Sequence, residues 1–136
     1  MKSSVITKPF EQPVVSFSFS DISELTLGVT GLRVVVSFDR THDDEDRYLE
    51  VLFSIPRGFR FLDEGDLLSY WGVVPVQTGH TIFEVKQGGW MEQEQSYGML
   101  NVTSAIGDFR EWLIVSSDGC LSVISKIEPM VRFIQR

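Results

Sequence analysis

Apolar and polar residues alternate with a period of two over much of this chain, a pattern typical of half-buried β-strands. The pattern is clearest in residues 15–20, 32–38 and 48–55. The last two segments are expected to pair, and the polar segment 39–47 between them is too long for a two-residue hairpin, so it predicts a solvated loop. The side chains expected on the inner face of this pair are Leu32, Val34, Val36, Phe38, Leu49, Val51, Phe53 and Ile55.

A tight hairpin is predicted near the end of the chain. Residues 112–124 form two β-rich runs joined around Asp118 and Gly119, and both residue types tolerate the positive φ angles of a tight turn. Residues 130–134 follow Pro129 and are expected to form an edge strand, where a missing amide hydrogen costs least.

The middle of the chain predicts two shorter strands and one or two helical turns. Residues 59–61 follow a Pro-Arg-Gly turn, and residues 81–85 have apolar side chains on both faces. Residues 63–71 begin with carboxylates, which favour the start of a helix. Residues 90–95 fit either a helical turn or the rim of a strand.

These elements predict a mainly β fold, in which a strongly curved antiparallel sheet closes into a small barrel or sandwich with one or two short helical turns. The 136 residues have average globular composition, with 43% hydrophobic and 23% charged residues, and no repeat or linker divides them. Residues 1–136 are therefore expected to form a single domain that needs no cofactor for stability.

The compartment is inferred from what the sequence contains and lacks. A single cysteine, Cys120, excludes an intrachain disulfide and fits a reducing compartment. No apolar stretch approaches the roughly 20 residues of a membrane helix, and the first residues do not resemble a secretory leader. We expect a cytoplasmic protein that does not associate with membranes.

Negative charge is concentrated in one predicted loop. The chain has 12 lysines and arginines against 19 acidic residues, a net charge of −7, and residues 39–50 hold six acids and two arginines, which gives −4. Such a run is typical of exposed surface. It lacks the alternate spacing and central glycine of a calcium loop, and the nearby His42 has no cysteine partner, so no metal site is predicted. The candidate partner-binding residues are Asp43, Asp44, Glu45 and Asp46.

Three aromatic residues near glycines are the other binding candidates. Tyrosine and tryptophan bury large areas and keep a polar group, so they serve cores and binding surfaces alike. Core packing and a role in a cleft or subunit contact both stay open for Tyr70, Trp71 and Trp90, whereas Trp112 is expected in the core of the hairpin.

Catalytic motifs are missing from the sequence. It has no Gly-x-Ser-x-Gly elbow and no phosphate-binding glycine loop followed by lysine. Cys120 begins an apolar strand and is expected to be an inert core residue. An enzyme is therefore the less favoured class, and His80 is the acid or base that it would use.

Residues 31–39, Gly-Leu-Arg-Val-Val-Val-Ser-Phe-Asp, resemble the first motif of Sm-like proteins, in which a glycine precedes an alternating apolar strand that ends at an acidic position. The resemblance implies a bent five-stranded barrel that often assembles into rings on RNA. The chain departs from the family at two places. Residues 42–46 occupy the loop in which the family offers an asparagine to a base, and residues 117–120 lack the Arg-Gly or Lys-Gly step of the second motif.

The charge distribution disfavours nucleic acid as a partner. The isoelectric point is about 4.7, and nucleic-acid binding draws much of its affinity from clustered lysines and arginines. Only the C-terminal end is locally basic. One hypothesis is that this end contacts the acidic segment of a neighbouring subunit. The charges at this end are Lys126, Arg132 and Arg136 against Glu128.

The favoured hypothesis is a non-catalytic β domain that binds another protein or itself, as a homo-oligomer with an exposed edge strand. One alternative is an Sm-like RNA-binding barrel, and another is a toxin-neutralising protein whose acidic loop mimics a nucleic acid. The last alternative is a small-ligand binder or enzyme with a cleft near Tyr70, Trp71 and Trp90.

Overall fold

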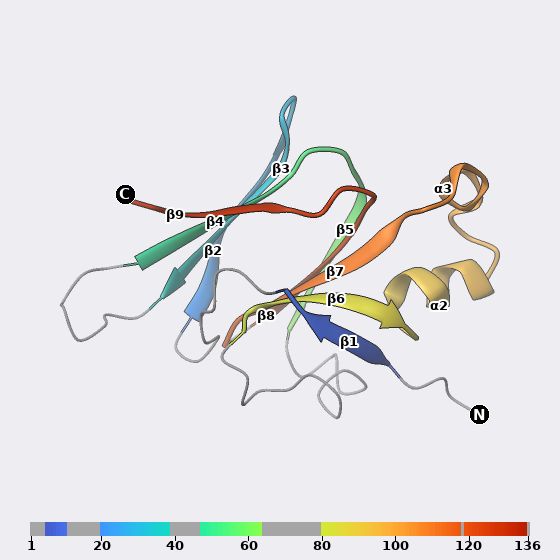
Figure 1. The fold of residues 1–136 in the computed structure, drawn as a ribbon, viewed down its shortest axis with the longest axis horizontal. Coiled ribbons are helices and arrows are strands. Elements are labelled where there is room, and N and C mark those ends of the chain that lie inside the picture. Colours follow the sequence, from blue (N-terminus) through green and yellow to red (C-terminus); the bar gives the residue numbers. More distant parts are fainter. Residues whose placement is uncertain (1–4, 11–19, 39–46, 64–79, 118, 136) are drawn as a thin grey trace.

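Two antiparallel sheets make up the fold in the computed structural model, which describes residues 5–10, 20–38, 47–63, 80–117 and 119–135 (Figure 1). The strand order is β1-β6-β7-β8-β5 in the five-stranded sheet and β2-β3-β4-β9 in the four-stranded sheet. The strands are β1 (Ile6–Pro9), β2 (Ser20–Gly28), β3 (Gly31–Phe38), β4 (Arg47–Phe53), β5 (Pro56–Asp63), β6 (Ile82–Gln87), β7 (Arg110–Val115), β8 (Gly119–Ser125) and β9 (Met130–Ile134), and the helices are α2 (Trp90–Ser96) and α3 (Asn101–Ile106).

The main core lies between the two sheets, because their inner faces contribute to one cluster of buried side chains. Period-two alternation places the apolar residues of β3 and β4 on this face, so that prediction is confirmed as far as Phe53. Ile55 lies beyond the end of β4 and is exposed. The cluster consists of Leu32, Val34, Val36, Leu49, Val51, Phe53, Ile82, Trp112, Ile114, Leu121 and Val123.

The outer face of the five-stranded sheet is also buried over β6, β7 and β8. As predicted, Ile82 and Phe83 lie on opposite faces, each in a different core cluster. Cys120 is fully buried here, as expected of a core cysteine. Helix α2 lies at this face, where the Met91 amide donates to Oε1 of the buried Glu111 at 2.9 Å. Because both faces are buried, these strands have nearly continuous apolar runs in place of simple alternation.

The two sheets are continuous through a corner. Strand β4 runs into β5 through residues 54–55, and β8 runs into β9 through residues 126–129. The register does not change across this corner. Leu52 lies opposite Met130, and Gly58, six residues further along, lies opposite Ile124, six residues further back. The four strands are thus two arms of one bent antiparallel ribbon, which gives the expected strong curvature. Within the described residues neither sheet closes on itself, so the predicted barrel is not confirmed.

Most strands that the alternation predicts are present, including the hairpin of β7 and β8 and the edge strand β9. Strand β2 beyond Ser20 was not predicted because a bulge between Ile22 and Glu24 interrupts its period. Ile22 and Leu25 are three residues apart, yet both pair with inner-face residues of β3. Strand β1 and helix α3 were also missed. Residues 15–19 and 64–71 lie outside the described part of the chain.

Among the described residues, no helix has the length and apolar character needed to cross a membrane.

Candidate functional site

Four apolar side chains of the edge strands β2 and β5 lie at inner-face positions of the two sheets. Leu25 and Leu27 of β2 pair with inner-face residues of β3, so they point toward the other sheet, as do Phe59 and Phe61 of β5, which pair with Val123 and Leu121. All four side chains nevertheless stay accessible, with exposed fractions of 36% for Leu25, 61% for Leu27, 37% for Phe59 and 51% for Phe61. We call this set the apolar opening.

The topology places both pairs of side chains at one side of the molecule. Strand β4 has β3 on one side and β9 on the other, and β8, which continues into β9, pairs with β5. Because β4 continues into β5, the side of β5 that does not face β8 corresponds to the side of β4 on which β3 and β2 lie. Among the described residues β2 and β5 are both edge strands, so each has one row of backbone N–H and C=O groups that pairs with no described strand.

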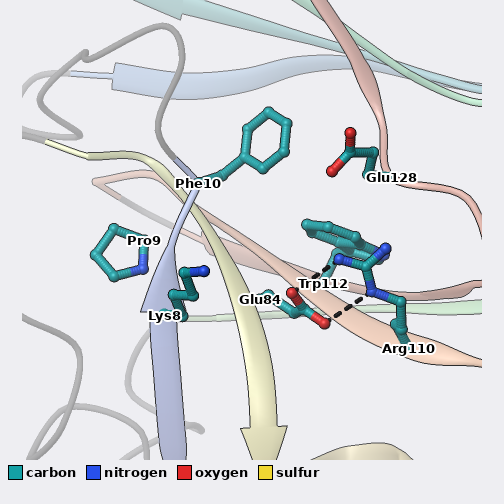
Figure 2. Close-up of a pocket in the computed structure, with 7 residues that line it drawn as sticks. All are labelled: Lys8, Pro9, Phe10, Glu84, Arg110, Trp112 and Glu128. Atoms are coloured by element: carbon teal, nitrogen blue, oxygen red, sulfur yellow. Dashed lines mark hydrogen bonds and ion pairs between the residues drawn. The ribbon is translucent and has the colours of Figure 1, made fainter.

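A polar cavity of about 360 Å³ lies on the inner face of the five-stranded sheet, beside the connection between β8 and β9 (Figure 2). Lys8, Glu84 and Trp112 lie in register across β1, β6 and β7, on the inner face. The remaining wall comes from the residues beside this row and from the connection between β8 and β9. We call this the polar pocket, and its lining consists of Lys8, Pro9, Phe10, Glu84, Arg110, Trp112 and Glu128.

A bidentate ion pair forms one wall of the polar pocket. Arg110 donates from Nε to Glu84 Oε2 at 2.8 Å and from Nη2 to Glu84 Oε1 at 2.9 Å (Figure 2). Lys86 Nζ lies 3.1 Å from Oε1. The Arg110 hydrogen bonds, more than Lys86, lower the pKa of Glu84 below its usual value although burial opposes them. Glu84 in turn raises the pKa of Arg110. Both oxygens of Glu84 are thus occupied within the protein.

The floor of the polar pocket is aromatic. The Arg110 guanidinium carbon lies 4.6 Å from the centroid of the Trp112 ring, and Phe10 meets that ring edge-on at 5.6 Å between centroids. Trp112 is 1% exposed, as expected of a core residue. Its indole N–H has no acceptor among the described residues, although a buried donor without a partner costs about 1–3 kcal/mol.

Two charged residues face each other across the pocket without a partner in the described part of the chain. Figure 2 shows Lys8 of β1 on one side of the cavity and Glu128 on the other. Both residues are exposed, and Glu128 acts on Arg110 only through a longer-range charge interaction. The sequence did not predict this pocket. Its signal was a charged residue two positions from a core residue on the same face of a strand, as for Glu84 beside Ile82 in β6 and Arg110 beside Trp112 in β7.

An ion-pair ladder crosses the outer face of the four-stranded sheet, with one residue from each strand. Glu50 Oε2 accepts from Arg33 Nε and Oε1 accepts from Arg132 Nε, both at 2.7 Å, and Arg33 also contacts Glu24 at 3.2 Å. Glu50 is 8% exposed, so assigning it to the solvated acidic run was wrong. Arg132, expected to be available to a neighbouring subunit, already holds a carboxylate of its own chain.

The predicted site residues are not brought together by the described structure. Asp43, Asp44, Glu45, Asp46, Tyr70 and Trp71 lie outside the described residues. Trp90 begins α2 and stacks with Arg60 at 5.2 Å, on the outer face of the five-stranded sheet. It therefore does not line the polar pocket. His80 packs against Phe83, which belongs to the outer-face cluster.

The described residues contain no group of three or more histidine, cysteine or acidic side chains arranged to hold a metal ion. Comparisons of the chain with models of protein families, with curated proteins and with solved structures find no match.

Proposed function

We propose that this chain is a non-catalytic protein-binding β domain, whose apolar opening receives apolar side chains of a second polypeptide. The observation that carries the proposal is that Leu25, Leu27, Phe59 and Phe61 are inner-face residues that stay accessible, on the side of the molecule to which the edges of β2 and β5 belong. Scattered apolar residues are normal on a surface, whereas a grouped set at the edge of a core is typical of an interaction site.

The edges of β2 and β5 support the same proposal. A free strand edge offers backbone donors and acceptors to an added strand, and neighbouring pockets then select its side chains. Phe59 and Phe61 are aromatic anchors of the kind that dominates binding energy at interfaces. The second polypeptide is either a different protein or a second copy of this chain, and the experiment below separates the two.

Nucleic-acid binding receives less support. Arg33, Arg110 and Arg132 each hold a carboxylate of the same chain, so their charge is already compensated. Ring assembly on RNA, barrel closure and toxin neutralisation by the acidic segment 43–46 remain predictions that the described residues do not address. A cytoplasmic location is likewise a prediction.

The test uses single charge insertions into the apolar opening. Leu27→Glu and Phe61→Glu place a carboxylate where a partner's apolar side chain would be buried, and Val102→Glu on α3 is the matched control because Val102 is 65% exposed outside the opening. All three variants are first checked for a native unfolding transition. Sedimentation velocity then measures self-association, and quantitative affinity capture from source-cell lysate compares partners with those of the unchanged protein.

The expected result is that both opening variants lose the oligomer, or lose the same captured protein, while Val102→Glu keeps it. Loss of the oligomer identifies a second copy as the partner, and loss of a captured protein from a monomer identifies a different one. The proposal is contradicted if the unchanged protein is a monomer and both opening variants capture the same proteins as it does.

A further inference from the structure

We infer that the polar pocket is a binding site for a small zwitterion, a molecule that carries an ammonium group and a carboxylate on an aromatic or apolar body. This inference does not depend on the proposed protein-binding function, because the pocket and the apolar opening have no residue in common. The pocket has about 360 Å³ of space, which is at the small end of the range for ligand sites.

The charges that a ligand can use are identified by elimination. Glu84 has both oxygens engaged by Arg110 and Lys86, so a ligand cation gains little there. Arg110 has its charge matched by Glu84 in a bidentate pair, which is the strongest common geometry for these groups. Lys8 and Glu128 are the lining charges that form no ion pair in the part of the chain that is described, and Glu128 acts on Arg110 at longer range.

The two remaining charges have opposite sign and lie on opposite sides of the cavity (Figure 2). Lys8 supplies an ammonium that attracts a carboxylate, and Glu128 supplies a carboxylate that attracts an ammonium. A ligand with a single charge would pair with one of these two residues and place its neutral end against the other. A zwitterion satisfies both, so charge complementarity selects it over either single ion.

The aromatic floor favours a ligand with an apolar or aromatic body. Phe10 and Trp112 meet edge to face, and Arg110 is stacked on Trp112. Free aromatic amino acids and short peptides with an aromatic residue share this chemistry.

The experiment compares zwitterions with their single-charge analogues. L-phenylalanine and the dipeptide glycyl-phenylalanine carry both charges at different separations, 3-phenylpropionate lacks the ammonium, and phenethylamine lacks the carboxylate. Binding to the full chain is measured by saturation-transfer NMR and calorimetric titration at millimolar concentrations. We expect at least one zwitterion to bind about tenfold more tightly than both analogues, since each lost charge contact is worth about that factor.

Four variants assign the binding to the pocket. Lys8→Met and Glu128→Gln each remove one of the two charges and should weaken the zwitterion about tenfold. Lys126→Met and Asp108→Asn are controls, because these residues neither line the pocket nor contact its Glu84–Arg110 ion pair, and they should leave the affinity within about twofold. The inference is overturned if neither zwitterion binds, if a single-charge analogue binds equally well, or if the control variants weaken binding as much as the pocket variants.

Discussion

At the scale of single residues, Glu50 shows how one carboxylate connects three strands. It lies on β4 between Arg33 on β3 and Arg132 on β9, and each arginine donates to a different oxygen. The Arg132 hydrogen bond, followed by that of Arg33, lowers the pKa of Glu50 although burial acts in the opposite direction. Glu50 and its arginines also cover Val35, which is fully buried on the outer face of the sheet.

The first prediction is that Glu50→Gln destabilises the protein by about 1–3 kcal/mol, because the amide keeps one acceptor oxygen for two arginines and Arg132 loses its counter-charge, whereas Arg33 keeps that of Glu24. Urea unfolding at pH 7 measures the free energy of unfolding. Glu24→Gln is the matched control, since Glu24 is one-third exposed and contacts only Arg33 in the ladder, at 3.2 Å. The control should cost less than about 1 kcal/mol. Equal losses for both variants would contradict the central role of Glu50.

The second prediction concerns acid. The folded pKa values of Glu50 and Glu84 both lie below the ordinary value of 4.5. Their stabilising contribution is complete above that value and is lost as the pH falls through the folded pKa, because the unfolded chain binds protons first. Urea unfolding between pH 7 and pH 3 should therefore show stability declining below about pH 4.5, and the double variant Glu50→Gln, Glu84→Gln should show a shallower decline. An unchanged slope in that variant would assign the acid sensitivity to other groups.

At the scale of elements, the hairpin of β2 and β3 depends on one glycine. Gly28 and Gly31 pair across a turn of two residues, but only Gly31 has a positive φ, of 119°. A Cβ at Gly31 would collide with the carbonyl oxygen of Phe53 on the neighbouring strand β4. Gly31 therefore allows both the turn and the close approach of β3 to the corner of the ribbon.

The third prediction follows from this difference between the two glycines. Gly31→Ala should destabilise the protein by at least about 2 kcal/mol, through backbone strain and the contact with Phe53. Gly28→Ala should change stability by no more than about 0.5 kcal/mol, because no atom lies within 4 Å of its added Cβ. Thermal and urea unfolding of both variants measure the difference. Comparable effects at the two positions would mean that neither strain nor the close approach matters.

The elements also show what the sequence could predict. Local signals were sufficient for β3, β4, β7 and β8, since alternation and an Asp-Gly turn act between residues close in sequence. The pairing of β4 with β9 and of β5 with β8 involves strands far apart in the chain, and periodicity has no information about it. The sites escaped prediction for the same reason, because Lys8, Glu84 and Glu128 meet only after folding.

At the scale of the whole molecule, the bent ribbon makes the two sheets one mechanical unit. Strands β4 and β5 pair with β9 and β8 on both sides of the corner, so separating either sheet disrupts the other. A second link lies at Ser20, which begins β2, because the Ser117 amide donates to its carbonyl oxygen at 2.9 Å. The inner faces share one core cluster, which adds the largest apolar coupling between the sheets.

The fourth prediction is that both sheets unfold together. Leu121→Ala removes a fully buried side chain from the five-stranded sheet and should lower the free energy of unfolding by about 2–5 kcal/mol. Because the ribbon and the core join the sheets, native-state hydrogen exchange should report the same loss for protected amides of β3 and β4 as for those of β7 and β8. Val102→Ala, on the exposed surface of α3, should leave both sets within about 0.5 kcal/mol. A loss confined to the five-stranded sheet would show that the four-stranded sheet is stable alone and that the ribbon bends at a hinge between two independent units.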